Sequence, residues 1–417
     1  MAVDFSNQVG WFKVRYGEIQ RAVPNFAEVQ KRVPFEARAK QGKTYNFPVR
    51  LTRSHGVTFN SDGTAFALND AVSPESDEAI VAGTELVIQE TISYGAMSRA
   101  ESSVEAFGDI FDETILSMRE SSAFYLELCM LYGGTSLAEV NTTPDQSGVQ
   151  QTATIKTASY APGIWTQMEN GYIDVYDDDF DPLRNVANVC QVDAFEPSTQ
   201  TLTFTGTESE LDTIVTGDLI LPRGAYNKWF SGIDKICTNT GSLFSIDASV
   251  YNLWKAQTHS ASSAAMSLAK INAALSKAVV RGLMEDVVCF LSVFTWSDLM
   301  NNLMTLRRFA ESTKREVEIG AQSIKLYGLT GSIELVPHPM VKAGECFLVP
   351  PKRLKRIGST DSTFRLKGSK NDNFFFELAG NAGVGVRNYW DQAVVPTQPA
   401  KMVKITTIVN DSLPNID

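Results

Sequence analysis

The sequence predicts an α+β fold with a long polypeptide arm that leaves the body of the molecule. Three observations support this class. Apolar and polar residues alternate at 45–51, as in a strand with one buried face, and apolar residues then recur every three or four positions up to Tyr132, as in a helix. After residue 267, helical and strand patterns alternate along the chain. Elements of both kinds, packed in layers, are typical of α+β proteins.

Residues 44–100 predict an extended hairpin. Its two strands each present one apolar face, formed by Tyr45, Phe47, Val49 and Leu51 in the first strand and by Leu86, Ile88 and Ile92 in a return strand at 84–92. The segment between them is small and polar, with glycines 56, 63 and 83 as pivots. Two strands alone bury too little apolar surface to be stable in water. The hairpin therefore needs a partner to lie on, which we expect to be another copy of the chain.

A long amphipathic helix is predicted at 101–132. Ser102 and Glu105 have the spacing of a capping box, and Gly133 and Gly134 end the helix. One buried stripe follows from residues at helical spacing: Phe107, Phe111, Thr114, Met118, Ser121, Tyr125, Leu128 and Tyr132. At 1.5 Å per residue this helix would be a rod of about 45 Å. A spine of this length beside a projecting arm is the outline of a subunit that tiles a surface.

The rest of the chain divides into three further regions. Residues 1–43 predict an extended, partly helical arm, because Pro24 and Pro34 interrupt any long helix. A β-rich unit follows the spine, with strands at 189–195, 201–205 and 217–221. From residue 267 the pattern predicts a helix ended by Gly282, a strand at 287–293 buried on both faces, and a helix capped by Thr295 with Asp298 in its first turn. Further strands are expected at 323–327, 331–336, 345–349 and 402–408.

Composition restricts the class of protein. With 417 residues, 43% of them hydrophobic and 20% charged, the chain has ample material for a buried core. No stretch reaches the length of an apolar membrane span, and the first residues do not form a signal peptide. The five cysteines are scattered, so we expect free buried thiols in a reducing compartment. A cytoplasmic site of synthesis follows.

The net charge of −11 argues against a dedicated nucleic-acid-binding protein. One basic segment is an exception, formed by Lys352, Arg353, Lys355, Arg356, Arg365, Lys367 and Lys370. Its first interpretation is a solvated or intersubunit charged surface. Its second is a loose contact with DNA phosphates that does not depend on base sequence.

The residues that could perform chemistry do not form a recognisable set. The three histidines, His55, His259 and His338, lie far apart in the sequence, and no nucleophile elbow accompanies them. We therefore predict no catalytic residues, no cofactor and no metal ligands. The densest acidic cluster comprises Asp174, Asp177, Asp178, Asp179 and Asp181; it is interpreted as a solvated turn, with a calcium site as the alternative. The glycine-rich segment 380–385 lacks the Lys-Ser/Thr of a phosphate-binding loop and is interpreted as a turn between strands.

The order of these elements resembles that of tailed-bacteriophage major capsid proteins, which share the Hong Kong ninety-seven phage head fold. The resemblance covers nearly the whole chain, from the arm and spine through the β insertion. It includes the segments at 232–234, 249–255, 290–303, 331–336 and 342–348. It implies five regions: an N-terminal arm (1–43), an E-loop hairpin (44–100), a peripheral domain with spine helix and β-rich insertion (101–245), an axial α/β domain (246–360), and return strands of the peripheral domain (361–417).

The resemblance also implies a function. Such a subunit would self-assemble into hexamers and pentamers of an icosahedral head that encloses double-stranded DNA, with portal and scaffolding proteins as partners. Assembly would take place in the bacterial cytoplasm, without a membrane, and the presence of a decoration protein stays open. Because the chain begins at Met1, we expect no cleaved N-terminal segment and a separate scaffolding protein.

Two other functions are compatible with the residues. Within the same fold, an encapsulin-like nanocompartment shell would hold a cargo enzyme in place of DNA. Outside it, a soluble hydrolase or binding protein with an unusual β insertion remains an alternative.

Overall fold

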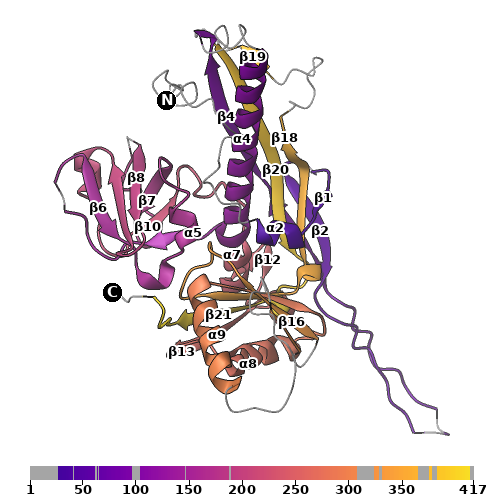
Figure 1. The fold of residues 1–417 in the computed structure, drawn as a ribbon. Coiled ribbons are helices and arrows are strands. Elements are labelled where there is room, and N and C mark those ends of the chain that lie inside the picture. The colour runs from indigo at the N-terminus through magenta and orange to yellow at the C-terminus, as the bar shows by residue number, and fades with distance from the viewer. Residues whose placement is uncertain are drawn as a thin grey trace.

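The computed structural model describes residues 27–40, 42–61, 63, 65–95, 104–145, 147–186, 189–307, 324–327, 331–364, 375–377 and 383–413. Most of the predicted N-terminal arm, the Ser102 cap, residues 380–382 of the glycine-rich segment, and three of the basic residues (Arg365, Lys367, Lys370) lie outside this part of the chain. Figure 1 shows a long helix standing beside a tall sheet, a β-rich lobe to one side, an α/β unit below and a thin arm that points away.

The spine helix α4 (Val104–Tyr132) has 29 residues, or about 44 Å, as its apolar repeat predicts. Thr114, Met118, Leu128 and Tyr132 of the predicted stripe are buried. The last turn is buried on every side, because α2 (Glu28–Arg32) and α7 (Ile233–Thr238) pack against it. Gly133 is required where this helix ends, since a Cβ there would lie 2.0 Å from the carbonyl oxygen of Phe230.

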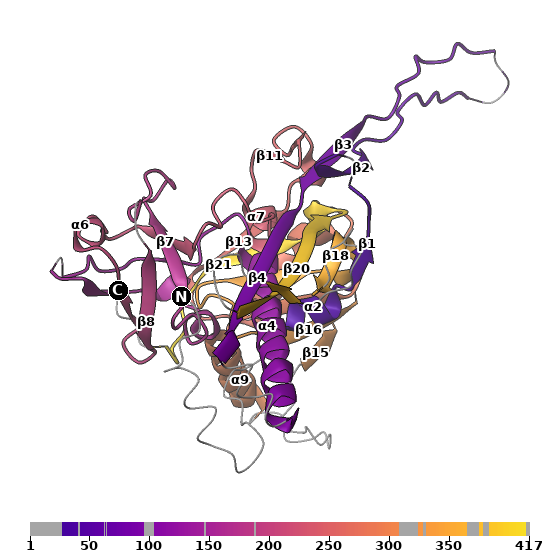
Figure 2. The same cartoon turned by 90° about the horizontal axis from the view of Figure 1, so that it is seen from above.

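The spine lies along a five-stranded sheet, and both are seen from above in Figure 2. The central strand of this sheet is β20 (Gly383–Pro396). On one side it pairs with β4 (Thr84–Ser93) over the whole length of β4. On its other side lie β18 (Leu354–Thr363) and β19 (Phe375–Glu377), and β1 (Phe35–Ala37) runs parallel to β18 at the edge.

The predicted partner of the first arm strand is wrong. Strand β2 (Thr44–Arg50) pairs with β3 (Ser76–Ala82), whereas the predicted return strand is β4 and belongs to the sheet beside the spine. The buried face of β2 is as expected, since Tyr45 and Leu51 are buried and Pro48 and Arg50 are exposed. Strand β3 is not recognised from the sequence because its first three residues, Ser76, Asp77 and Glu78, are polar and exposed.

The β insertion is a six-stranded sheet in the order β5-β10-β7-β8-β9-β6. Its strands are β5 (Ala138–Glu139), β6 (Gln150–Thr154), β7 (Tyr172–Tyr176), β8 (Cys190–Glu196), β9 (Thr201–Thr205) and β10 (Leu219–Pro222). The three predicted strands correspond to β8, β9 and β10. Short helices α5 (Pro162–Trp165) and α6 (Glu208–Leu211) and the turn η1 (Thr157–Ser159) complete this lobe.

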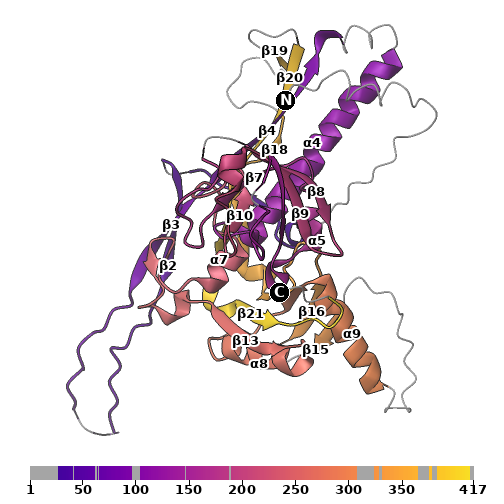
Figure 3. The same ribbon diagram turned by 90° about the vertical axis from the view of Figure 1, so that its left-hand side faces the viewer.

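The α/β unit contains the second six-stranded sheet, in the order β13-β21-β17-β14-β16-β15. Its strands are β13 (Gln257–Ala264), β14 (Val287–Leu291), β15 (Ile324–Tyr327), β16 (Ser332–Pro337), β17 (Cys346–Val349) and β21 (Val403–Ile408). Every residue of β14 is buried, as predicted. Helix α8 (Leu268–Val279) covers one face and is capped by the Ser267 side chain. Figure 3 shows this unit below the spine.

The remaining short elements are β11 (Ser242–Leu243), β12 (Ile246–Asp247), η2 (Asn252–Trp254), η3 (Pro351–Arg353) and η4 (Pro399–Lys401).

The predicted cap of the next helix is also wrong. Helix α9 (Val293–Arg307) begins before Thr295, and the Ser292 hydroxyl accepts from the Phe294 N–H at 3.4 Å. Thr295 is buried inside the helix and donates to Asn410 at 2.8 Å. Asp298 accepts from the backbone N–H groups of Asp411 and Ser412 instead of acting on its own helix end. Both side chains thus fasten the C-terminal segment.

Candidate assembly site

The arm loop, defined here as residues 51–75, is the most exposed part of the described chain. It continues from β2 and β3 and points away from the body in two perpendicular views (Figures 1 and 2). Five large apolar side chains on it are exposed: Val57, Phe59, Phe66, Leu68 and Val72. Phe59 is 92% exposed. Exposed apolar side chains gathered on one segment mark a surface that another molecule covers.

Few hydrogen bonds hold the two sides of the arm loop together. Leu51 N–H donates to the Glu75 carbonyl at 2.9 Å, and His55 N–H to the Val72 carbonyl at 3.2 Å. Further out, the Asn69 backbone N–H donates to the Thr58 hydroxyl. Together with the contacts between Thr52 and Glu75 and between Asn69 and Val57, these are isolated hydrogen bonds in place of the continuous pairing of β2 with β3.

The root of the arm, in contrast, is built into the body. Tyr45 is fully buried, and its hydroxyl accepts from the Ser359 N–H at 3.0 Å. The Ile80 N–H donates to the Phe244 carbonyl. Gly83, expected to be a pivot, is instead tightly packed. A Cβ there would lie 2.9 Å from side-chain atoms of both Tyr45 and Asp391, so close packing requires glycine. Gly63 does have a positive φ of 93°.

Two grooves border these elements. One, of about 590 Å³, lies at the arm root, and its charged lining is basic: Arg50, Arg53, Arg281, Lys355 and Lys401. The other, of about 480 Å³, runs between β4 and the spine and is lined by Ile88, Glu90, Met118 and their neighbours. Both open to the surface.

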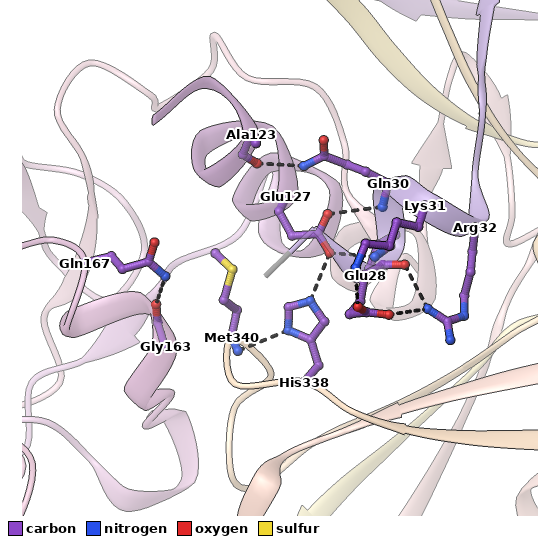
Figure 4. A network of polar contacts seen from close by, with 11 residues as sticks. Glu28, Gln30, Lys31, Arg32, Ala123, Glu127, Gly163, Gln167, His338 and Met340 are labelled. Carbon is purple, nitrogen blue, oxygen red and sulfur yellow. Dashed lines mark hydrogen bonds and ion pairs between the residues drawn. The ribbon is translucent and has the colours of Figure 1, made fainter. Parts of the chain in front are cut away.

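A buried polar cluster fastens the segment before the arm to the spine (Figure 4). The Glu127 carboxylate, 1% exposed, accepts from the backbone N–H groups of Val29 and Gln30 at the start of α2, at 2.6 and 3.1 Å. It is also 2.9 Å from the His338 imidazole. The positive end of a helix favours a carboxylate, so Glu127 replaces the missing side-chain cap of α2.

A second buried cluster joins the α/β unit to the spine. The Lys404 ammonium on β21 donates to Asp234 at 2.5 Å and to Glu345 at 2.6 Å. Burial opposes its charge, but these carboxylates outweigh burial and raise the pKa of Lys404. Burial raises the pKa of Glu345 and lowers that of Lys342, whose ammonium lies over the Tyr132 ring. The contacts of Lys404 join β21 to α7 and to the residue that precedes β17.

Sequence reasoning missed both clusters. The signal was available: Glu127 interrupts the apolar end of the spine, and Lys404 interrupts an apolar strand. A charged residue at a position whose neighbours are all buried needs a partner.

Four residues of the predicted acidic cluster, Asp177, Asp178, Asp179 and Asp181, lie in the turn after β7, whereas Asp174 is in β7 itself. Asp174 is buried and accepts from the Gly224 N–H, while Asp177 and Asp179 accept from backbone N–H groups of the turn itself. Arg184 lies 3.2 Å from Asp177. Among the described residues, no group of three or more His, Cys, Asp or Glu side chains is arranged to hold a metal ion.

The described part of the basic segment is largely paired with acids. Arg353 makes a bidentate ion pair with Glu285, and the Lys355 ammonium lies 3.0 Å from the Glu36 carboxylate. Arg356 is buried and lies over the Phe35 ring, 3.6 Å from Asp361. In the described part of the segment, these three basic side chains are therefore held by contacts within the chain.

The structure places the three histidines on separate elements. His55 is on the arm loop, His259 on β13, and His338 in the buried cluster with Glu127. Among the helices that the structure describes, none is long and apolar enough to cross a membrane.

Comparison with known proteins gives a match at the level of structure. No protein-family model matches the sequence, and no curated protein does. The capsid asymmetric unit of cyanophage A-1(L) superposes with a TM-score of 0.55 at 8% identity, over 94% of this chain and 96% of that chain. Mycobacterium phage Bobi (TM-score 0.47, 10% identity, 97% and 99% covered) and a virus-like particle from Pyrococcus furiosus (TM-score 0.33, 8% identity, 90% and 90% covered) are more distant.

The cyanophage likeness covers nearly all of both chains. It therefore shows that this chain has the fold of a tailed-phage major capsid protein. At this identity the likeness defines the fold alone.

Proposed function

We propose that the chain is the major structural subunit of an icosahedral phage head and has no enzymatic activity. Copies assemble as hexamers and pentamers into a closed shell that encloses double-stranded DNA, formed in the bacterial cytoplasm and retained in the virion. Portal and scaffolding proteins are its partners. The five regions expected from the sequence are the proposed divisions of this subunit, with two changes. The E-loop is limited to β2, β3 and the loop between them, and β21 belongs to the α/β unit instead of the peripheral return strands.

The observation that carries the proposal is the arm loop on a capsid fold. Its apolar side chains, Phe59 above all, lie in solvent in the single chain. Burying such side chains on a neighbour is favourable by about 25 cal/mol per Å² of apolar surface. An arm that leaves one subunit and covers the next makes a head-to-tail contact, which generates a ring when the rotation between subunits closes.

The proposal is tested by removing the loop while keeping its root. Residues 56–71 are replaced by a short Gly-Ser linker, because His55 and Val72, which are kept, are already joined by a backbone hydrogen bond. Residues 76–82 are kept, since Ala79 and Val81 of β3 are buried. We expect a folded subunit that forms no closed particles in electron microscopy, whereas the full chain forms shells.

Normal shells from the loop-deleted chain would refute the role of the arm. A full chain that stays monomeric when expressed with the other head proteins of its phage would refute the capsid function. Shells that hold a cargo enzyme and no DNA would identify the nanocompartment instead.

A further inference from the structure

Two cysteine sulfurs meet in the core of the α/β unit. The Sγ atoms of Cys289 on β14 and Cys346 on β17 are 3.0 Å apart. This separation is about 1 Å longer than a disulfide bond of about 2.05 Å. Both residues are 0% exposed.

Strand pairing explains the contact. β14 and β17 are antiparallel, with Cys289 opposite Leu348 and Cys346 opposite Leu291. The two cysteines are therefore diagonal neighbours on the same face of the sheet, where they pack under α8. The remaining cysteines lie on other elements: Cys129 in α4, Cys190 in β8 and Cys237 in α7.

We propose that Cys289 and Cys346 form a reversible oxidation site, at which a peroxide converts the two thiols into a disulfide that bridges β14 and β17. One sulfur attacks a peroxide oxygen, so that the O–O bond breaks and a sulfenic acid and water form. The second sulfur then attacks the sulfenic sulfur; the S–S bond forms, the S–O bond breaks and a second water leaves. Two thiols and one hydrogen peroxide thus give one disulfide and two waters.

The surroundings set the rate and the product. The hydrogen bond with Cys289, together with burial, raises the pKa of Cys346 well above its usual value. Little thiolate is present at neutral pH, so the first step is slow. The neighbouring sulfur then captures the sulfenic acid before further oxidation, because the two atoms are held together. A reducing compartment keeps the pair as thiols, and an oxidising environment preserves the bridge.

The bridge would stiffen the sheet. It joins residues 57 positions apart in the sequence, and the loop that it closes includes α9, β15 and β16. Cross-linking restricts the unfolded chain more than the folded one, so the oxidised protein has the higher melting temperature. This inference does not depend on the proposed function.

The test counts thiols in the full-length protein. The folded chain is treated with hydrogen peroxide at mildly alkaline pH, quenched, denatured and alkylated with iodoacetamide, and its mass is measured. We expect the five alkylated cysteines of the untreated protein to fall to three, with one peptide pair linked through Cys289 and Cys346. A phosphine reductant restores all five.

Matched variants give the specificity. Cys129→Ser loses two alkylation sites on oxidation, as the parent does, whereas Cys289→Ser and Cys346→Ser lose none and form no link. Five alkylated cysteines after oxidation, a link to another cysteine, or sulfinic acid at Cys289 or Cys346 would each overturn the proposal.

Discussion

His338 donates a hydrogen bond to Glu127 across 2.9 Å in the buried centre of the molecule. The direction follows from the other ring nitrogen: His338 Nδ1 accepts from the Met340 N–H at 3.1 Å, so Nε2 carries the proton. The Glu127 carboxylate thus faces three donors, from His338, Val29 and Gln30. This one side chain connects the N-terminal segment, the spine and the loop after β16.

Removing that carboxylate is expected to be costly. Glu127→Ala leaves three donors, two of them fully buried, without this acceptor and should lower the free energy of unfolding by about 3 kcal/mol or more. Urea denaturation measures this loss. Glu127→Gln keeps one carbonyl oxygen as an acceptor and should lose less. An alanine variant within about 0.5 kcal/mol of the parent would contradict this role for Glu127.

A pH dependence is expected at Glu285. The hydrogen bond from Arg353, together with that from Lys401, outweighs the opposing effect of burial and lowers the pKa of Glu285 from its usual 4.5. The folded state therefore favours the ionised carboxylate, and this stabilisation is present above pH 4.5 and is lost as the pH falls through the lowered pKa. The contribution is about 0.5–1 kcal/mol for a partly exposed ion pair.

Melting curves of Glu285→Gln and the parent check this expectation. The melting temperature of the parent should exceed that of the variant near neutral pH, and the two should converge in acid. A difference that does not change with pH would show that the ion pair does not contribute in this way.

Phe59 is expected to matter for assembly and not for folding. Because its ring is 92% exposed, Phe59→Ser should change the free energy of unfolding of the single chain by less than about 0.5 kcal/mol. Particle yield, measured by sedimentation, should fall. Phe59→Tyr keeps the ring and serves as the matched control, with near-normal yield. Equal yields from the serine variant and the parent would exclude Phe59 from the interface.

The middle of the spine tolerates little backbone change. Met118 is 1% exposed within α4, and Met118→Pro removes a helical hydrogen bond and places its ring against the preceding turn. This costs about 3 kcal/mol or more. Met118→Leu, of similar volume, should cost less than about 1.5 kcal/mol. Thermal unfolding distinguishes them, and a proline variant as stable as the leucine variant would contradict a continuous helix there.

Local patterns predicted much of this fold. The stripe along the spine, the one-sided burial of β2 and the fully buried β14 follow from spacing and composition alone. The pairing of the arm strands did not follow, because β3 begins with three polar residues and β4 has the clearer alternation. What decides between them is β20, a strand some 300 residues away in the sequence that matches β4 along its length.

Side-chain partners were the least predictable feature. Thr295 and Asp298 have the sequence pattern of a helix start, yet both contact the segment 410–412. Glu127 and Lys404 are recognisable as charged residues in apolar surroundings. The donors to Glu127 and the acceptors for Lys404, however, come from distant segments. Such contacts depend on the tertiary arrangement, which local spacing does not encode.

The junction between β3 and β4 has a mechanical consequence. A single residue, Gly83, separates a strand of the arm from a strand of the sheet beside the spine, and it is enclosed by Tyr45 and Asp391. The base of the arm therefore cannot rotate independently of the sheet beside the spine. If copies of the chain pack at different angles, as the proposed shell requires, the arm can bend only beyond Arg50 and Ser76, where the pairing of β2 with β3 ends.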